Sequence, residues 1–405
     1  MKSELLEAEL RTFAEFGETT RELTRKIEGT EIPYFVNEFW TSKQRAAHSL
    51  HEVSYRACFK PQLPRFFIER LTQPGDTVYD PFMGRGTTLL EAALLDREVV
   101  GCDVNPLAPI LCGPRLQPPT FEEVAARLDE ISFQGRVEKE DEELNVFYHR
   151  ETLGQLRALQ GYFDEKGLFL DEVDTWIRMV ATNRLTGHSP GFFSVYTLPP
   201  NQAASVTSQR KINAKRDQVP PVRDVPAIIL KKSKALLKNL DRKKDEALWR
   251  RGKEARILTS SAAETSELEP ESIDLVVTSP PFLDVIDYKG DNWLRCWFNG
   301  FDASQVGIWG YRKPEEWQEA MGKVLKELSR VLKPGGHVAF EVGEVRKGSI
   351  LLEELVVPVG LMAGLVPKLV LVNEQEFTKT ANCWGVENLG KGTNTNRVVV
   401  FTKPS

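Results

Sequence analysis

The 405-residue sequence has few cysteines, no long apolar run and no apolar segment at its start. Its five cysteines form no Cys-x-x-Cys pair and no metal-ligand spacing, which favours reduced thiols and predicts no metal site. The longest apolar stretch, residues 355–366, is too short to span a bilayer and contains Pro358. Residues 1–7 lack the apolar core of a secretory signal. These absences argue against a secreted or membrane protein, and we expect a cytoplasmic one.

Acidic and basic residues are unevenly distributed along the chain. The net charge is −5, yet residues 209–256 hold sixteen Lys and Arg against six Asp and Glu. A charged segment is often only a solvated helix face, but an excess of this size suits contact with phosphates. The candidate DNA-binding residues are Arg210, Lys211, Lys215, Arg216, Lys231 and Lys232. An aromatic loop, residues 187–196, precedes them and would suit contacts with bases.

Residues 77–103 follow the pattern of strand, glycine-rich loop, helix, strand and acid. The first apolar run ends at Asp80, Gly84 and Gly86 follow, and the second run ends at Asp103. Glycines let the backbone approach a ligand at a helix N-terminus, and an acid after the second strand suits ribose hydroxyls. The third glycine of a dinucleotide fingerprint is missing. The pattern therefore predicts the first half of a nucleoside-binding α/β sheet.

A later apolar run, residues 273–278, stops at Ser279-Pro280-Pro281-Phe282. This indicates a buried strand that ends in a rigid loop, because proline fixes φ and lacks an N–H donor. A hydroxyl, firmly held carbonyls and an aromatic ring could bind an exocyclic amine and stack its base. A turn without chemistry is the alternative that the tetrad by itself leaves open.

Together the two motifs resemble those of the N4-cytosine and N6-adenine DNA amino-methyltransferases, most closely the N4-cytosine enzymes with a Ser-Pro-Pro-Phe tetrad. Residues 80–88 are similar to their DPFxGxGTT loop for S-adenosylmethionine, and residues 59–61 to the lysine–proline element upstream of it. The resemblance implies that the catalytic residues are Ser279, Pro280, Pro281 and Phe282. It implies cofactor contacts from Phe59, Lys60, Asp80, Pro81, Phe82, Gly84, Gly86, Thr87, Thr88, Asp103, Asn105 and Thr278.

The fold that this resemblance implies is α/β, a Rossmann-like methyltransferase sheet with a largely helical inserted domain. An N-terminal helix is expected within residues 1–30, as one amphipathic helix over 3–28. The cofactor-binding first half of the methyltransferase domain should cover 31–115, and the catalytic second half 256–405. The inserted helical and basic lobe, 116–255, is the candidate target-recognition domain. It falls after the second strand, earlier than the position expected for such a domain.

The resemblance also implies a reaction, the transfer of a methyl group to the amine of a base flipped out of duplex DNA. The Ser279 hydroxyl and the Pro280 carbonyl would accept the amine hydrogens and favour its rehybridisation. In the family, Ser at the first tetrad position mostly accompanies N4-cytosine and Asp mostly accompanies N6-adenine, so cytosine is favoured. We expect a restriction-modification enzyme, monomeric or homodimeric, with double-stranded DNA as substrate and a cognate restriction endonuclease as functional partner.

Three alternatives remain open at this point. The first is an N6-adenine DNA methyltransferase. The second is an RNA base methyltransferase, because some enzymes that modify tRNA guanine share a similar glycine loop and tetrad. The third is a non-catalytic DNA-binding protein that kept the fold, against which the intact Asp80, Gly84, Gly86 and Asp103 argue.

Overall fold

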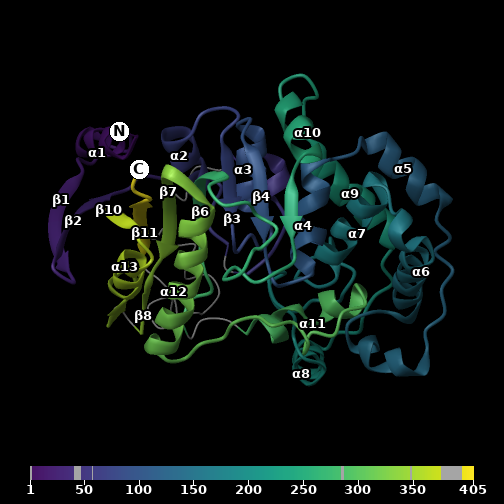
Figure 1. The fold of residues 1–405 in the computed structure, drawn as a ribbon. Coiled ribbons are helices and arrows are strands. Elements are labelled where there is room, and N and C mark those ends of the chain that lie inside the picture. The colour runs from purple at the N-terminus through teal and green to yellow at the C-terminus, as the bar shows by residue number, and fades with distance from the viewer. Residues whose placement is uncertain (1, 41–46, 57, 284–286, 347–348, 375–394) are drawn as a thin grey trace.

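A mixed nine-stranded sheet forms the centre of the computed structural model, which describes residues 2–40, 47–56, 58–283, 287–346, 349–374 and 395–405 (Figure 1). In sheet order the strands are β1 (Arg21–Ile27), β2 (Thr30–Asn37), β10 (Val366–Glu374), β11 (Thr395–Thr402), β7 (Leu332–Val342), β6 (Ile273–Thr278), β3 (Thr77–Asp80), β4 (Glu98–Cys102) and β5 (Arg256–Leu258). A separate small ladder pairs β8 (Glu344–Val345) with β9 (Ile350–Leu351).

The order of the parallel strands reverses at β3. Strands β4 and β5 continue the sheet on one side of β3, and β6 and β7 continue it on the other, all in parallel register. In an open α/β sheet the connections on the two sides of such a point leave in opposite directions, which opens a crevice at the carboxyl ends of the strands. The sheet confirms the α/β methyltransferase fold expected from the sequence, including the antiparallel pairing of β10 with β11.

Apolar clusters cover both faces of the sheet except at the edge strand β1, which is exposed over all but Ile27. In β10, Leu369 and Leu371 join one apolar cluster, whereas Val370 and Val372 join the other. The period of two follows from the alternation of side chains along a strand. Helices α2 (Gln62–Leu71), α3 (Thr87–Leu94) and α4 (Leu107–Leu116) pack in the first cluster, and α12 (Pro314–Val331) and α13 (Leu352–Met362) pack in the second. In the part of the chain described, no helix is long and apolar enough to cross a membrane.

The N-terminal region differs from its prediction. Helix α1 covers only Lys2–Thr12, and β1 and β2 then form an antiparallel hairpin that extends the sheet beyond β10. The expected helix over 3–28 is therefore wrong after Thr12. Leu23 and Ile27 are four residues apart, a spacing that places them on one face of a helix and equally on one face of a strand. The turn that follows favours the strand, because Glu28 and Gly29 have φ of 46° and 82°, and a two-residue hairpin turn of type I′ requires positive φ at both positions.

The predicted helical insertion is present between β4 and β5, and Figure 1 shows its helices beyond the β5 edge of the sheet. Its helices are α5 (Phe121–Glu130), η2 (Lys139–Val146), α6 (Arg150–Lys166), η3 (Gly167–Phe169), α7 (Glu172–Arg184), α8 (Val206–Arg216), α9 (Val225–Leu237) and α10 (Glu246–Lys253). The acidic stretch near residue 140 forms the short helix η2.

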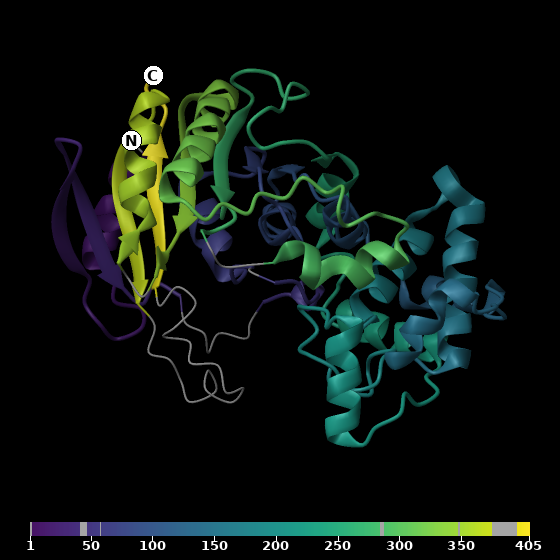
Figure 2. The same cartoon turned by 90° about the horizontal axis from the view of Figure 1, so that it is seen from below.

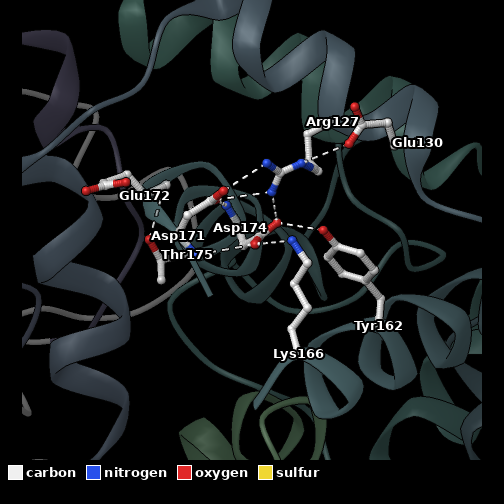
Figure 3. Close-up of polar contacts among 8 residues, drawn as sticks. All are labelled: Arg127, Glu130, Tyr162, Lys166, Asp171, Glu172, Asp174 and Thr175. Atoms are coloured by element: carbon white, nitrogen blue, oxygen red, sulfur yellow. Dashed lines mark hydrogen bonds and ion pairs between the residues drawn. The ribbon is translucent and has the colours of Figure 1, made fainter. Parts of the chain in front are cut away.

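A charged cluster joins three helices of this lobe (Figure 3). The buried carboxylate of Asp174, in the first turn of α7, accepts hydrogen bonds from Arg127 of α5 and from Tyr162 and Lys166 of α6. Arg127 also pairs with Asp171 at 2.8 Å and holds the pKa of that carboxyl well below its usual range, at about 2. A buried carboxylate needs such partners to offset its desolvation, so the cluster fixes the relative positions of the three helices.

Candidate active site

A cavity opens at the carboxyl ends of β3, β4 and β6, where the strand order reverses. It measures about 770 Å³ including its open mouth, within the range of small-molecule sites. Its walls are formed by the loop after β3 (Asp80, Pro81, Phe82, Met83, Gly84 and Thr87), the segment after β4 (Asp103, Val104 and Asn105), the tetrad (Ser279 and Pro281) and residues from elsewhere (Tyr55, Cys58, Phe59, Ala262, Ile308 and Trp309). The two sequence motifs, almost two hundred residues apart, therefore share one cavity.

The glycine loop depends on left-handed backbone conformations. Gly84 and Gly86 have φ of +49° and +76°, which side chains other than glycine rarely adopt. A Cβ on Gly86 would lie 2.2 Å from the Cys112 sulfur of α4, so this glycine is also required for close packing. Gly84 lines the cavity, and a Cβ there would make only ordinary contacts, with the Tyr55 ring at 3.6 Å and the Phe82 carbonyl oxygen at 3.9 Å.

Asp80 joins the glycine loop to the tetrad strand. Its Oδ1 accepts hydrogen bonds from the Phe82 amide at 3.0 Å and from the Thr278 hydroxyl at 2.6 Å. Burial raises the pKa of Asp80 to about 6, and these donors limit the rise because they stabilise the ionised form. With this pKa, the Asp80 carboxyl that lines the cavity is mostly ionised near neutral pH.

Asp103 is fixed by two backbone donors. Its carboxylate oxygens accept from the Gly84 and Asn105 amides, each at 2.9 Å. Burial raises the pKa of Asp103 to about 6, and the two amides counteract that rise. Each carboxylate oxygen keeps a further lone pair, so the group can also accept the hydroxyls of a ribose. Asn105 donates to the Tyr55 hydroxyl at 3.1 Å, which places that ring in the wall of the cavity.

The tetrad lies where β6 leaves the sheet. Ser279 and Pro281 line the cavity, Pro280 is buried, and Phe282 is half-buried against the second apolar cluster. The indole of Trp317, in α12, donates to the Pro281 carbonyl at 2.8 Å. This contact and the two fixed proline φ angles hold the loop rigid.

Glu341 is a functional candidate that the sequence did not suggest. It lies near the end of β7, beside β6, and is only 4 % exposed. Burial raises the pKa of Glu341 to about 6, whereas its interactions with the Ser279 hydroxyl and the Asn396 amide oppose the rise. Asn396 donates to Glu341 at 2.6 Å. A buried carboxylate behind the cavity-lining hydroxyl can orient that hydroxyl and take up a proton.

The predicted cofactor residues divide into two groups. Those that line the cavity are Phe59, Asp80, Pro81, Phe82, Gly84, Thr87, Asp103 and Asn105. Those that do not are Lys60, Gly86, Thr88 and Thr278. Lys60 is exposed, Thr88 donates to the Val277 carbonyl at 3.2 Å, and Thr278 donates to Asp80. Gly86, Thr88 and Thr278 therefore support the loops that form the wall, whereas the exposed Lys60 does not line the cavity.

Trp309 is a further cavity residue that sequence reasoning missed. It lies between α11 (Tyr288–Phe298) and α12, in a segment without helical or strand periodicity, so no pattern marked it. Its ring packs edge-on against Phe82, with ring centroids 5.9 Å apart, and Tyr311 packs behind it at 6.0 Å. A signal was present only in composition, as two aromatic residues within a polar stretch.

The expected role of the aromatic loop is wrong for two of its rings. Phe192 and Phe193 are buried in the lobe, where the Arg184 guanidinium covers Phe192 at 4.0 Å and the Phe193 amide donates to the Arg184 carbonyl at 2.9 Å. These rings cannot reach a base. Of the predicted DNA-binding residues, Arg210, Lys211, Lys215 and Arg216 lie on α8, and Lys231 and Lys232 lie on α9.

Comparison with known proteins agrees with this geometry. Residues 18–108, which contain the glycine loop and Asp103, match the sequence model of the DNA methylase family N6_N4_Mtase. The cofactor that this family implies is S-adenosylmethionine. The DNA methylase match covers the cofactor half of the site and ends before the tetrad.

Three curated proteins are also similar to this chain. The type II methyltransferase M.MvaI from Kocuria varians is 30% identical over 31% of this chain and 26% of its own length. The type II methyltransferase M.BsoBI from Geobacillus stearothermophilus is 23% identical over 66% of this chain and 55% of its own length. A tRNA (guanine(10)-N2)-dimethyltransferase from Methanocaldococcus jannaschii is 26% identical over 24% of this chain and 29% of its own length. The chain thus spans about a quarter to about half of these relatives.

Proposed function

We propose that this protein is a site-specific DNA methyltransferase that transfers a methyl group from S-adenosylmethionine to the exocyclic N4 of cytosine in duplex DNA. Ser279 carries the proposal, because it presents a neutral hydroxyl to the cavity that Asp80, Gly84 and Asp103 also line. The DNA methylase match and the type II methyltransferase relatives support DNA as the substrate. They also support a role as the modification enzyme of a restriction-modification system, with a cognate endonuclease as functional partner.

The residues of the cavity fit the proposed cofactor. Asp103 can accept ribose hydroxyls, and Gly84 leaves the wall open next to it. The rings of Phe59, Phe82 and Trp309 offer flat surfaces for a purine and π faces for a sulfonium. When bound, S-adenosylmethionine supplies an electrophilic methyl group on a positively charged sulfur.

The tetrad would prepare the amine for that methyl group. An exocyclic amine is a weak nucleophile because its lone pair is delocalised into the ring. The Ser279 hydroxyl and the Pro280 carbonyl would accept its two hydrogens and so favour a tetrahedral nitrogen. Holding the amine in line with the electrophile supplies much of the rate. Pro281 would keep the loop in place, and Phe282 would stack on the flipped base.

Glu341 completes the proposed proton path. A hydroxyl that donates to a carboxylate is a better acceptor on its other side, which suits Ser279 for the amine hydrogen. Methylation of the amine produces a cation that must lose a proton. Ser279 can receive that proton at its oxygen while passing its own to Glu341. A pKa of about 6 makes this carboxylate an effective acceptor near neutral pH.

Mass spectrometry of nucleosides tests the proposal. Plasmid DNA incubated with the protein and S-adenosylmethionine should yield N4-methylcytosine. The Ser279→Ala variant should lose activity by about a hundredfold, comparable to the removal of one positioned hydrogen-bonding group. Ser272→Ala, just before the start of β6, is the matched control and should remain active, because the Ser272 hydroxyl donates to the local Glu269 carbonyl. N6-methyladenine as the sole product would overturn the choice of base.

An RNA substrate is the second candidate, favoured by the tRNA methyltransferase relative. Competition between duplex DNA and tRNA for radiolabelled methyl groups separates the two. Label found only in tRNA would replace the DNA proposal.

A further inference from the structure

We infer that α8 binds the DNA phosphate backbone through Arg210, Lys211 and Lys215. This inference rests on the proposed function. It narrows the partner surface from the whole basic segment, residues 209–256, to one helix.

Helix α8 carries uncompensated positive charge. It contains no acidic residue between Val206 and Arg216. Arg210, Lys211 and Lys215 are exposed, and none of them takes part in an ion pair within the part of the chain that the structure describes. Lys211 and Lys215 lie one helical turn apart, so their charges repel each other in the free protein. A polyanion bound along this side would remove that repulsion and release its own counterions.

Four other cations of the basic segment are paired with acids elsewhere in the protein. Glu52 pairs with Lys232 at 3.7 Å and with Lys238 at 3.1 Å. Burial lowers the pKa of Lys232 to about 8, which weakens it further as a phosphate contact. Two arginines of α10, Arg250 and Arg251, pair with Asp96 at 2.6 Å and 2.7 Å. These four ion pairs reduce the positive charge that the region of α9 and α10 offers to a polyanion.

The proposed cations play no part in holding α8 in place. Gln209, on the buried side, donates to the Tyr196 carbonyl at 3.0 Å, and Asn213 donates to the Val146 carbonyl at 2.7 Å. The Arg216 guanidinium stacks on the Tyr196 ring at 3.7 Å, so we assign this fourth cation to packing. Amides and one stacked arginine fix the helix, and folding does not explain the three exposed cations.

The position of α8 suits a substrate that must reach the tetrad. The Ala203 amide donates to the Asp291 carbonyl, and the Trp293 indole donates to the Ala204 carbonyl, each at 3.1 Å. Both contacts tie the start of α8 to α11, the helix that follows the tetrad. Figures 1 and 2 show α8 beside α11, and Figure 1 shows α10 at the opposite end of the molecule. A duplex on α8 would thus lie on the side where the tetrad opens.

The test compares two variants with equal losses of charge. In R210Q/K211Q/K215Q the α8 cations are neutralised. In K243Q/K244Q/K253Q three exposed cations at and around α10 are neutralised instead. Binding to a fluorescein-labelled random-sequence duplex, in the presence of S-adenosylhomocysteine, is measured by anisotropy over a series of KCl concentrations. Circular dichroism and S-adenosylhomocysteine affinity show that both variants are folded.

The α8 variant should bind at least tenfold more weakly, and its slope of log K against log salt should fall by about two to three, near 0.9 per lost phosphate contact. The α10 variant should keep the wild-type slope. An unchanged slope for the α8 variant, or equal losses in both variants, overturns the inference while wild-type methylation leaves the proposed function standing. A wild-type protein that neither binds nor methylates duplex DNA overturns the proposed function as well.

Discussion

The hydroxyl of Thr278 donates a 2.6 Å hydrogen bond to the carboxylate of Asp80, and both groups are fully buried. The two residues end the neighbouring parallel strands β6 and β3. Thr278 immediately precedes the tetrad, and Asp80 opens the glycine loop. Together with the pairing of β3 and β6, this contact fixes the proposed catalytic tetrad relative to the glycine loop.

Thr278→Val tests this link with a side chain of the same shape. Without the hydroxyl the ionised Asp80 loses a buried donor, so the free energy of unfolding near neutral pH should fall by about 1–3 kcal/mol. Affinity for S-adenosylhomocysteine, measured by calorimetry, should fall as well. Thr278→Ser keeps the donor and should retain most of both properties. Equal losses in the two variants would show that the methyl group, through packing, matters more than the hydrogen bond.

The raised pKa of Asp103 predicts that cofactor binding depends on pH. The carboxylate is ionised above about pH 6 and accepts ribose hydroxyls best in that form. Affinity for S-adenosylhomocysteine should therefore decline as the pH is lowered through 6, and Asp103→Asn should show weak binding with a flatter profile. A wild-type affinity that stays constant from about pH 5 to 8 would contradict this role for Asp103.

Ionisation of Asp103 should lower the stability of the folded protein, although it should strengthen cofactor binding. A carboxyl whose pKa is higher in the folded protein than in the unfolded chain binds more protons when folded, so its contribution to stability is lost as the pH rises through the folded pKa. The free energy of unfolding of Asp103→Asn, relative to wild type, should consequently increase between about pH 4 and 7. Urea titrations across this range measure the difference.

Gly86 and Gly84 should respond differently to an added methyl group. Gly86→Ala places a Cβ 2.2 Å from the Cys112 sulfur at a residue with positive φ. We expect the free energy of unfolding to fall by about 1–3 kcal/mol. Cys112→Ala in the same chain should recover part of that loss. Gly84→Ala meets no atom closer than 3.6 Å, so thermal unfolding should shift less while S-adenosylhomocysteine affinity drops. Identical effects at the two glycines would rule out the steric explanation.

Trp309 should contribute to cofactor affinity although it lies outside every recognised motif. Trp309→Ala removes one aromatic wall of the cavity and the edge-on contact with Phe82, and we expect about a two- to tenfold weaker binding of S-adenosylhomocysteine. Trp309→Phe keeps a ring and should bind nearly as well as wild type. Calorimetry provides the affinities, and unchanged binding in Trp309→Ala would remove this residue from the site.

Much of the site was predictable because its geometry is local. The loop from Asp80 to Thr87 needs only a strand end, two glycines at positive φ and a helix start, and these are encoded within a few residues. The same holds for the tetrad, where two prolines restrict the backbone. The N-terminal hairpin was not predictable from periodicity, because Leu23 and Ile27 fit a helix and a strand equally well.

Residue types and spacing by themselves indicated the glycine loop, the tetrad and the basic segment, and the resemblance of the two motifs to a known family implied the cofactor. Only the tertiary structure showed which further residues join the site and which cations of the basic segment form ion pairs. It brought Glu341 behind Ser279, placed Trp309 in the cavity wall, and paired four cations of the basic segment with acids that are distant in the sequence. Such contacts join segments that are far apart in the sequence, so no local sequence pattern predicts them.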